Sequence, residues 1–342
     1  MTGSLRRVWL LGTIALTVGA VAVTVALAPA GDAPPGRALQ WLLFVGSSVH
    51  VAATGWFFSV PEVRRHAAQH TGRYVWAPLG LVAGTAALAA VLPERLFIWP
   101  LLAFFAWQFF HFQKQNLGMA ALAGVAHGAG SVRPRERVAI VAAGGAGIAG
   151  LLVRPDLLQL TADPQVDWLF PVAGAAFVLA AAAGVVVLRE RPPAQRPVQY
   201  VAVYVVSLCF FAPVFLFDSP YAAVAGLTIA HGYQYLLIVG LVAGARRPGL
   251  GPVVSLAVLV NVALLGGLAL NAASHLHGGG TVARAVFGAY TGLLMAHFVV
   301  DAGLWRLRDA FPRQFLTERL PYLLPQPRAT PESAATGGPP AR

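Results

Sequence analysis

Ten apolar runs, most of them close to 20 residues long, follow one another along the 342-residue chain. A run of about 20 residues crosses the hydrocarbon core of a bilayer as an α-helix. Because 57% of the residues are hydrophobic and only 11% are charged, this interpretation overrides the two soluble domains that length alone would suggest. We predict an all-α fold, a polytopic membrane bundle of about ten transmembrane helices within residues 1–306. The expected spans are residues 8–29, 38–60, 75–92, 95–115, 137–153, 167–188, 198–217, 220–243, 251–270 and 282–304.

Arginines alternate between the loops at the two ends of the predicted bundle. One set of loops is rich in arginine, and the opposite loops carry single arginines beside acidic residues. Loops rich in positive charge stay in the cytoplasm. We therefore expect a protein of a bacterial-type inner membrane with both termini on the cytoplasmic side. The same distribution accounts for the net charge of +11 without a nucleic-acid partner. The basic loops contain Arg6/Arg7, Arg64/Arg65/Arg73, Arg133/Arg135/Arg137, Arg189/Arg191/Arg196, Arg246/Arg247 and Arg306/Arg308.

The two ends of the chain differ from the bundle. The first apolar run follows Arg6 and Arg7 and is longer than the core of a typical signal peptide, so we expect it to be a retained span; a cleaved signal is the alternative. Residues 307–323 are expected to form an interfacial segment on the membrane surface. Residues 324–342, rich in Pro, Ala, Gly, Thr and Ser, are expected to be a disordered cytoplasmic tail.

Four of the apolar runs contain polar side chains, which hydrocarbon tolerates only when they pair, face a cavity or bind a ligand. The longest such stretch runs from Trp107 to Gly118 and contains the only lysine of the chain, Lys114. The other three are residues 50–54, 231–235 and 297–301, and each begins with a histidine. We predict that the four stretches form one site.

The histidines of these stretches agree in direction and in depth. They lie on the second, fourth, eighth and tenth expected spans, so all four helices should run from the outside to the inside. Each lies about 11–16 residues into its span, a spread in depth of about 7 Å at a rise of 1.5 Å per residue. The alternative is that each forms an interhelical hydrogen bond without binding a ligand. The four residues are His50, His111, His231 and His297.

Each histidine is followed three or four residues later by a polar side chain on the same helical face. Metal-bound histidines usually donate their second ring nitrogen to such a group. Asp301, the only carboxylate expected within a span, should either do this or bind the metal itself. Lys114 could instead extend to the interface, and Gln234 could join helices. The companions are Thr54 after His50, Gln115 after His111, Gln234 and Tyr235 after His231, and Asp301 after His297. We assign the four histidines and Asp301 as metal ligands, and as catalytic groups Asp301, Lys114, Gln115 and Gln234.

The remaining histidines are weaker candidates. His66 and His70 have a spacing that places both rings on one helical face and could serve a second metal, or they could belong to a solvated basic loop. His127 is expected in a loop, and His275 and His277 on the outer side, away from the site.

Neutral imidazoles with one carboxylate suit iron, zinc or copper, and do not suit calcium or magnesium. We predict one or two non-haem iron ions with an open position for O2, and zinc, copper or haem as alternatives. A site within the bilayer favours an apolar or amphipathic small molecule, and its position near the inner leaflet would admit a cytoplasmic electron donor. The expected activity is that of an O2-dependent metal oxidoreductase, an oxygenase or oxidase. The alternatives are a haem-binding electron-transfer protein, a zinc-dependent membrane hydrolase and a proton-coupled transporter.

In these patches the chain resembles the bacterial membrane β-carotene-cleaving oxygenases. The resemblance rests on His50, His111, His231 and the stretch from His297 to Asp301, and it implies that histidines from several transmembrane helices hold a non-haem iron. The chain also resembles bacterial multi-span proteins without an assigned activity. They carry three patches, which here are His111 to Gln115, His231 to Tyr235, and His297 to Trp305 by way of Asp301.

Overall fold

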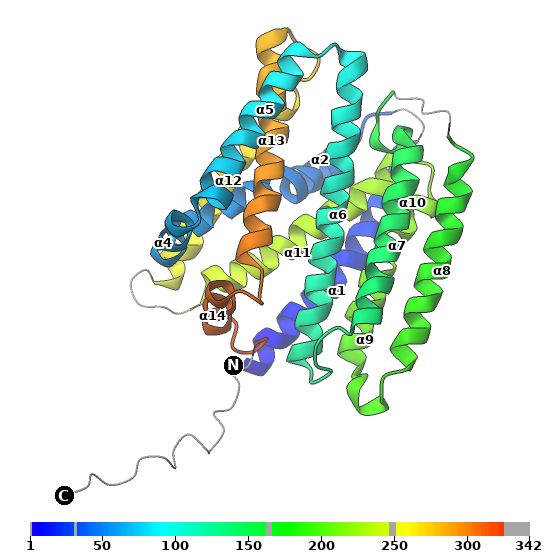
Figure 1. The fold of residues 1–342 in the computed structure, drawn as a ribbon, viewed down its shortest axis with the longest axis vertical. Coiled ribbons are helices and arrows are strands. Elements are labelled where there is room, and N and C mark those ends of the chain that lie inside the picture. The colour runs from blue at the N-terminus through cyan, green and yellow to red at the C-terminus, as the bar shows by residue number, and fades with distance from the viewer. Residues whose placement is uncertain (1, 31–32, 162–165, 246–250, 325–342) are drawn as a thin grey trace, which may run out of the picture.

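The computed structural model describes residues 2–30, 33–161, 166–245 and 251–324 as an assembly of helices (Figure 1). Helix makes up 82% of the structure, so the predicted all-α fold is confirmed. The basic pair Arg246/Arg247 and the expected tail from residue 325 onward lie outside the described residues. Leu324, at the start of that expected tail, is buried.

Among the described residues, nine helical segments are long and apolar enough to cross a membrane, which indicates an integral membrane protein. Six of them are the single helices α1 (Thr2–Leu27), α6 (Glu94–Ala126), α7 (Pro134–Val153), α8 (Leu169–Arg189), α12 (Pro252–Ser274) and α13 (Thr281–Leu304). The segment Tyr221–Ala243 joins η6 (Tyr221–Ala225) to α11 (Gly226–Ala243). The segment Arg37–Ser59 joins α2 (Arg37–Phe44), η1 (Val45–Val49), α3 (His50–Ala53) and η2 (Thr54–Ser59), and the segment Gly72–Val91 joins η3 (Gly72–Trp76) to α5 (Ala77–Val91). η1 and η3 are π-helical turns, and η2 is a 3-10 helix. η6, directly before α11, is also a π-helical turn.

The expected span 198–217 is not one helix, and this prediction needs correction. It consists of α9 (Val198–Leu208) and α10 (Ala212–Leu216). Pro213 lies in the first turn of α10. A proline has no backbone N–H and its ring clashes with the carbonyl one turn earlier, so the helix breaks before it. The prediction of ten spans therefore becomes nine long helices and one broken apolar segment.

The fourth span also differs from its expected bounds of 95–115. α6 continues to Ala126 and has 33 residues, about 50 Å at the helical rise. The side-chain amide of Gln113 and the backbone carbonyl of Asn116 form hydrogen bonds with neighbouring helices. Gln113 Nε2 donates to the Ile140 carbonyl of α7 at 2.5 Å, and Ser207 of α9 donates to the Asn116 carbonyl at 3.2 Å. The longer helix places His111 near its middle.

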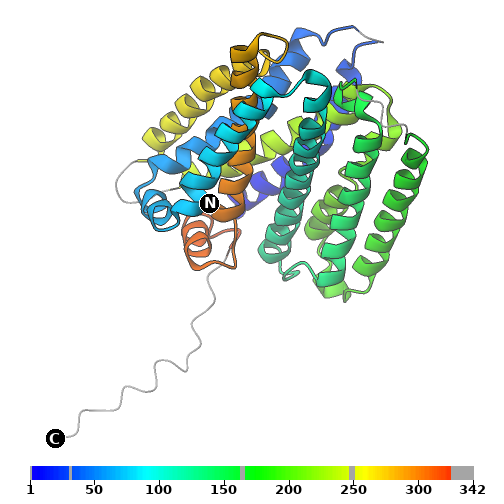
Figure 2. The same ribbon diagram turned by 45° about the horizontal axis from the view of Figure 1, so that its top comes forward.

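The helices form two groups on either side of α6. α5, α12 and α13 lie on one side, and α7, α8 and α9 on the other, in both Figure 1 and Figure 2. α1 and α11 pack against each other and cross the middle of the molecule obliquely. Small residues permit the close packing of α13 on α5: a Cβ atom at Gly288 would lie 2.7 Å from Ala89 Cβ, and one at Gly292 would lie 2.5 Å from Val82 Cα.

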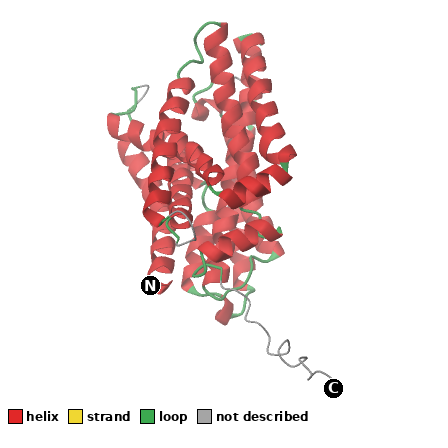
Figure 3. Ribbon diagram, turned by 90° about the vertical axis from the view of Figure 1, so that its left-hand side faces the viewer, coloured by secondary structure: helices red, strands yellow, loops and turns green. Residues whose placement is uncertain are grey.

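Shorter helices lie between the spans and after the last one, and Figure 3 shows helices and loops among the described residues. They are α4 (Pro61–Gln69), η4 (Pro155–Leu158), η5 (Pro193–Gln195) and α14 (Ala310–Arg319). α14 lies within the expected interfacial segment and packs against α11. It lies at the same end of the molecule as the start of α1 (Figure 1).

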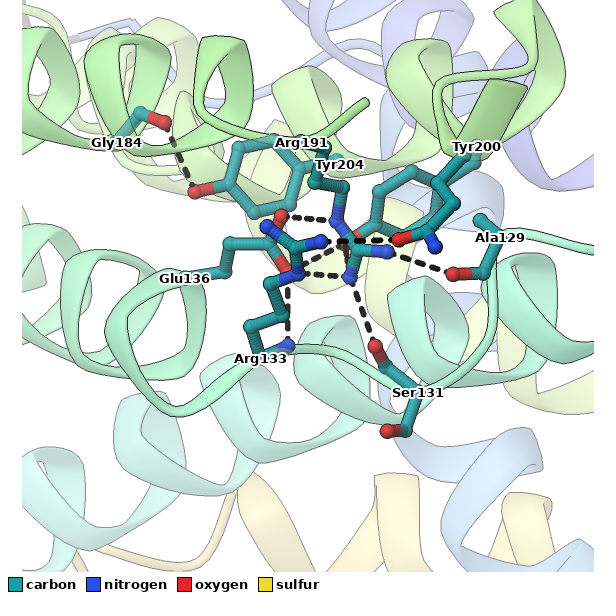
Figure 4. Close-up of polar contacts among 9 residues, drawn as sticks. Ala129, Ser131, Arg133, Glu136, Gly184, Arg191, Tyr200 and Tyr204 are labelled. Carbon is teal, nitrogen blue, oxygen red and sulfur yellow. Dashed lines mark hydrogen bonds and ion pairs between the residues drawn. The ribbon is translucent and has the colours of Figure 1, made fainter. Parts of the chain in front are cut away.

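One predicted surface charge is buried. Arg191, in the basic loop after α8, is 2% exposed and forms an ion pair with Glu136, which is fully buried in the first turn of α7 (Figure 4). Arg191 also donates to the carbonyls of Ala129 and Ser131 at 2.6 and 2.7 Å. This contact with Glu136 raises the pKa of the Arg191 guanidinium. Asp301 is thus not the only carboxylate buried in the bundle.

Replacing Arg191 with leucine should lower the free energy of unfolding by about 3–5 kcal/mol, because it leaves the Glu136 carboxylate buried without a cation. Arg135 provides a control, since its ion pair with Glu190 at 3.3 Å is exposed. Arg135→Leu should change stability by less than about 1 kcal/mol. Unfolding in detergent, followed by circular dichroism, would measure both. Equal effects would contradict a structural role for the buried pair.

Candidate metal centre

The four predicted histidines come together in the interior from four separate helices. His50 begins α3, His111 lies in α6, His231 in α11 and His297 in α13. The ring centroids of His50 and His111 each lie 5.0 Å from that of His231, and they lie 5.2 and 5.1 Å from that of His297. His50, His231 and His297 are at most 4% exposed, and His111 is half-buried. The structure thus brings the four histidines together.

Two glycines bring His50 and His231 together. A Cβ atom at Gly46, in the π-helical turn before His50, would lie 2.8 Å from Ile229 Cα of α11. A Cβ atom at Gly232, next to His231, would overlap the carbonyl oxygen of Gly46. The backbones of η1 and α11 therefore touch, which larger residues would prevent. π-helical turns often occur at functional sites, and a second one, η6, begins the segment that carries His231.

The Nε2 atoms of all four histidines are buried without a hydrogen-bond partner in the described part of the chain. A buried polar atom without a partner costs free energy, and most such atoms in folded proteins are satisfied. Four adjacent unpaired ring nitrogens are therefore the arrangement expected of imidazoles that ligate an ion.

The Nδ1 atom of His297 belongs to a hydrogen-bond chain that ends at a carboxylate. It lies 2.6 Å from Thr54 Oγ1, which lies 2.7 Å from the Tyr235 hydroxyl. Tyr235 donates to Asp301 Oδ1 at 2.9 Å, and Asp301 Oδ2 lies 3.7 Å from Nδ1 of His297. Asp301, Tyr235 and Thr54 are all at least 95% buried.

With the Asp301 carboxylate ionised, this series of hydrogen bonds determines which nitrogen of His297 carries the proton. The Tyr235 hydroxyl hydrogen points to Asp301, so its oxygen must accept the hydrogen of Thr54. The Thr54 oxygen must in turn accept from Nδ1–H of His297. Nε2 of His297 then keeps its lone pair, as a metal-ligating imidazole requires.

Two groups of side chains have metal-binding spacing. The ligand atoms of His50, His231 and His297 lie within 4.8 Å of one another, and so do those of His111, His297 and Asp301. Both groups use His297. Since its Nδ1 is bonded to Thr54, the structure favours Nε2 as the ligand and Asp301 as the group that orients this ring. All five predicted ligands lie in the centre, and the histidines form its nitrogen-donor set.

The predicted pairing of each histidine with its own companion is mostly wrong. Thr54 contacts His297 and not His50, and Gln115 donates to the His231 carbonyl at 2.9 Å and not to His111. Of the companions, only Asp301 lies beside its own histidine. Spacing along one helix places two side chains on a common face, but here the neighbouring helices supply closer partners.

The other predicted catalytic residues lie around the centre. Gln115 Nε2 is 3.0 Å from Gln234 Oε1, and Gln234 Nε2 donates to Thr17 Oγ1 of α1 at 2.5 Å. These amides join α6, α11 and α1 and make no described bond to an imidazole. Lys114 is exposed, and no described polar contact connects it to the histidines.

The remaining histidines lie apart from the centre. His66 and His70 lie at the end of α4 with ring centroids 4.3 Å apart and their planes inclined by 37°, so a helix occupies part of the expected loop. His127 follows α6 in a turn, and His275 and His277 are exposed at the end of α12.

Sequence reasoning missed Gly46 and Thr17 near the histidines, and it missed the buried pair of Glu136 and Arg191 away from them. For Glu136 there was a signal, since Arg-Pro-Arg-Glu matches the start of a helix with an acidic third residue.

Comparisons with known protein families, with curated proteins and with solved structures found no match. The resemblance of the histidine patches to membrane β-carotene-cleaving oxygenases therefore stays a prediction.

Gly232→Leu should lower the free energy of unfolding by about 1–3 kcal/mol or more, because its side chain cannot fit against the Gly46 carbonyl. Gly240→Leu is the control on the same helix, since no atom lies within 4 Å of a Cβ at that position. Thermal unfolding in detergent would compare them. A Gly232→Leu protein as stable as the Gly240→Leu protein would show that this close contact is not required.

Proposed function

We propose that this protein is an integral-membrane metalloenzyme whose four histidines hold a non-haem iron and that it oxidises an apolar or amphipathic small molecule with O2. The observation that carries the proposal is the set of four buried Nε2 atoms, to which no described residue offers a hydrogen bond. Imidazole nitrogen suits iron, zinc, copper and nickel. Bound iron would supply one-electron and O2 chemistry, which side chains alone lack.

The number of nitrogen donors favours iron over zinc. Catalytic zinc usually has three protein ligands and one open position, and a fourth imidazole would close its tetrahedral shell. Iron accepts a larger number of ligands and can keep positions open for O2 and substrate. Zinc-dependent hydrolysis is the second candidate, because His50, His231 and His297 alone form a group that leaves His111 aside.

The residues around the histidines orient the imidazoles and exclude water. Phe298 stacks on His111 with centroids 4.5 Å apart, and Phe112 stacks on His231 at 4.0 Å. Haem bound through two of the histidines is the alternative that a Soret band would reveal. The negative charge of Asp301, held by Tyr235, would partly balance the charge of a cation. A proton-coupled transporter would use the same groups without a bound metal.

The location follows from the arginine distribution. We propose that the protein lies in a bacterial-type inner membrane with both ends in the cytoplasm. α14 and the start of α1 would then face the cytoplasm together. An electron donor would approach this end, where the remaining exposed arginines favour an acidic partner.

Protein purified in detergent should contain iron, absorb without a Soret band and lose the metal on substitution of a ligand. His231→Ala and His297→Ala should lower the metal content at least tenfold, because each removes a donor from the set. His275→Ala is the control, since this histidine is exposed at the end of α12. Elemental analysis with an optical spectrum would measure both quantities. Because alanine at a buried position leaves a cavity, His231→Gln and His297→Gln should be included.

If these variants, folded by circular dichroism, retain full metal content, the assignment of the site is wrong. Stoichiometric zinc, with activity that needs neither O2 nor a reductant, would favour the hydrolase.

Thr54→Val should weaken metal binding by about 10–100-fold, because it removes the acceptor that fixes the tautomer of His297. Thr13→Val in α1 is the matched control. The Thr13 hydroxyl is also buried, but it has no described partner. Metal titration with a competing chelator would give both dissociation constants. An unchanged constant in Thr54→Val would mean that the hydrogen-bond chain does not act on the metal site.

A further inference from the structure

A cleft of about 750 Å³ opens near the start of α2, between that helix, the end of α12 and the start of η6. None of the four histidines lines it. Its volume falls within the range of small-molecule sites, about 300–1,000 Å³. The wall combines the aromatic and aliphatic side chains of Trp41, Phe44 and Leu268 with Arg37 and Asn271.

The charge that lines the cleft is positive. Arg37 is the one side chain of permanent charge among the described lining residues, which include no carboxylate. Arg37 is exposed, and the described residues supply no hydrogen bond or ion pair to its guanidinium. A guanidinium without a partner is well suited to a carboxylate or a phosphate, which it can bind through two parallel hydrogen bonds.

Two apolar side chains of the cleft are exposed. Trp41 is 64% exposed and Leu268 is 56% exposed. These side chains lie beside the cationic group and give the cleft one polar and one apolar part. An acyl chain is the ligand portion that would cover them, since burying apolar area contributes about 25 cal/mol per Å².

The cleft adjoins the metal centre through the same helical segments. Ser47 lines the cleft, and His50 follows it by three residues, a rise of about 5 Å. α12, which contributes Leu268 to the cleft, packs along η1 and α3, and a Cβ atom at Gly267 would lie 2.8 Å from Val49 Cγ2. The cleft therefore lies beside the turn that carries His50 into the cluster.

We infer that this cleft binds an acyl-chain amphiphile with an anionic head group at Arg37, and that such molecules are the substrate class of the histidine centre. The second part rests on the proposed function. The anionic head contacts Arg37 and Asn271, and the chain lies along Trp41 and Leu268 toward the segment of His50.

Binding of radiolabelled oleate to the full-length protein in phosphatidylcholine nanodiscs tests the inference, with oleyl alcohol as the neutral comparison. Arg37→Gln should raise the dissociation constant of oleate about tenfold or more, because a hydrogen bond to a charged group is lost. Arg95→Gln, an exposed arginine at the start of α6, should leave it unchanged. Leu268→Gln should weaken binding, whereas Leu265→Gln, one turn earlier and 67% exposed, should not.

The titrations are run on iron-loaded and on chelator-treated protein. Saturable oleate binding in both forms that depends on Arg37 supports the cleft as the binding site. If phosphatidylglycerol in the nanodisc competes with oleate, the anionic ligand of the cleft is a bilayer lipid. Equal affinity for oleyl alcohol, or no effect of Arg37→Gln, would overturn the anionic head group. No saturable oleate binding by iron-loaded protein would overturn the cleft and leave the proposed function intact. Oleate binding by a protein that never takes up metal would overturn the proposed function alone.

Discussion

The contact between Gly232 and the carbonyl of Gly46 is the constraint on which the centre depends. Imidazole side chains are short, so rings from different helices meet at centroid distances near 5 Å only if the backbones behind them are close. The two glycines permit this approach where α11 crosses the π-helical turn before His50. The other two histidines then complete the cluster from α6 and α13, which are held by packing on both sides. A side chain larger than hydrogen at either glycine would separate the first pair of rings.

The centre was predictable to the level of its histidines, and less so beyond them. Direction and depth in the membrane follow from charge and hydropathy, and they place His50, His111, His231 and His297 together. The hydrogen-bond partners do not follow, because they come from other helices whose rotation the sequence does not reveal. Thr54 illustrates this, since it belongs to the face of His50 by spacing yet contacts His297. Lys114 follows His111 by three residues and yet is exposed.

The helical bundle was predictable from its apolar runs, with errors where polar residues are satisfied inside the protein. Gln113 lies at the expected end of the fourth span, but its amide donates to a carbonyl of α7, and α6 continues. Arg191 suggested a surface loop, but Glu136 neutralises it in the interior. Hydropathy counts a polar residue as a cost wherever it occurs, whereas the folded protein removes that cost by pairing. The break between α9 and α10 has a local cause in Pro213, which the length of the apolar run concealed.

The broken segment α9–α10 bears on whether the chain crosses the membrane an odd or an even number of times. A chain that crosses a membrane an odd number of times leaves its two ends in different compartments, and nine long helices alone would do so. The start of α1 and α14 nevertheless lie at one end of the molecule (Figure 1). In the proposed topology, α9 and α10 count together as one further passage, which makes the number of crossings even. A segment whose helices are each too short to cross alone would thus set the side of the membrane on which α14 lies.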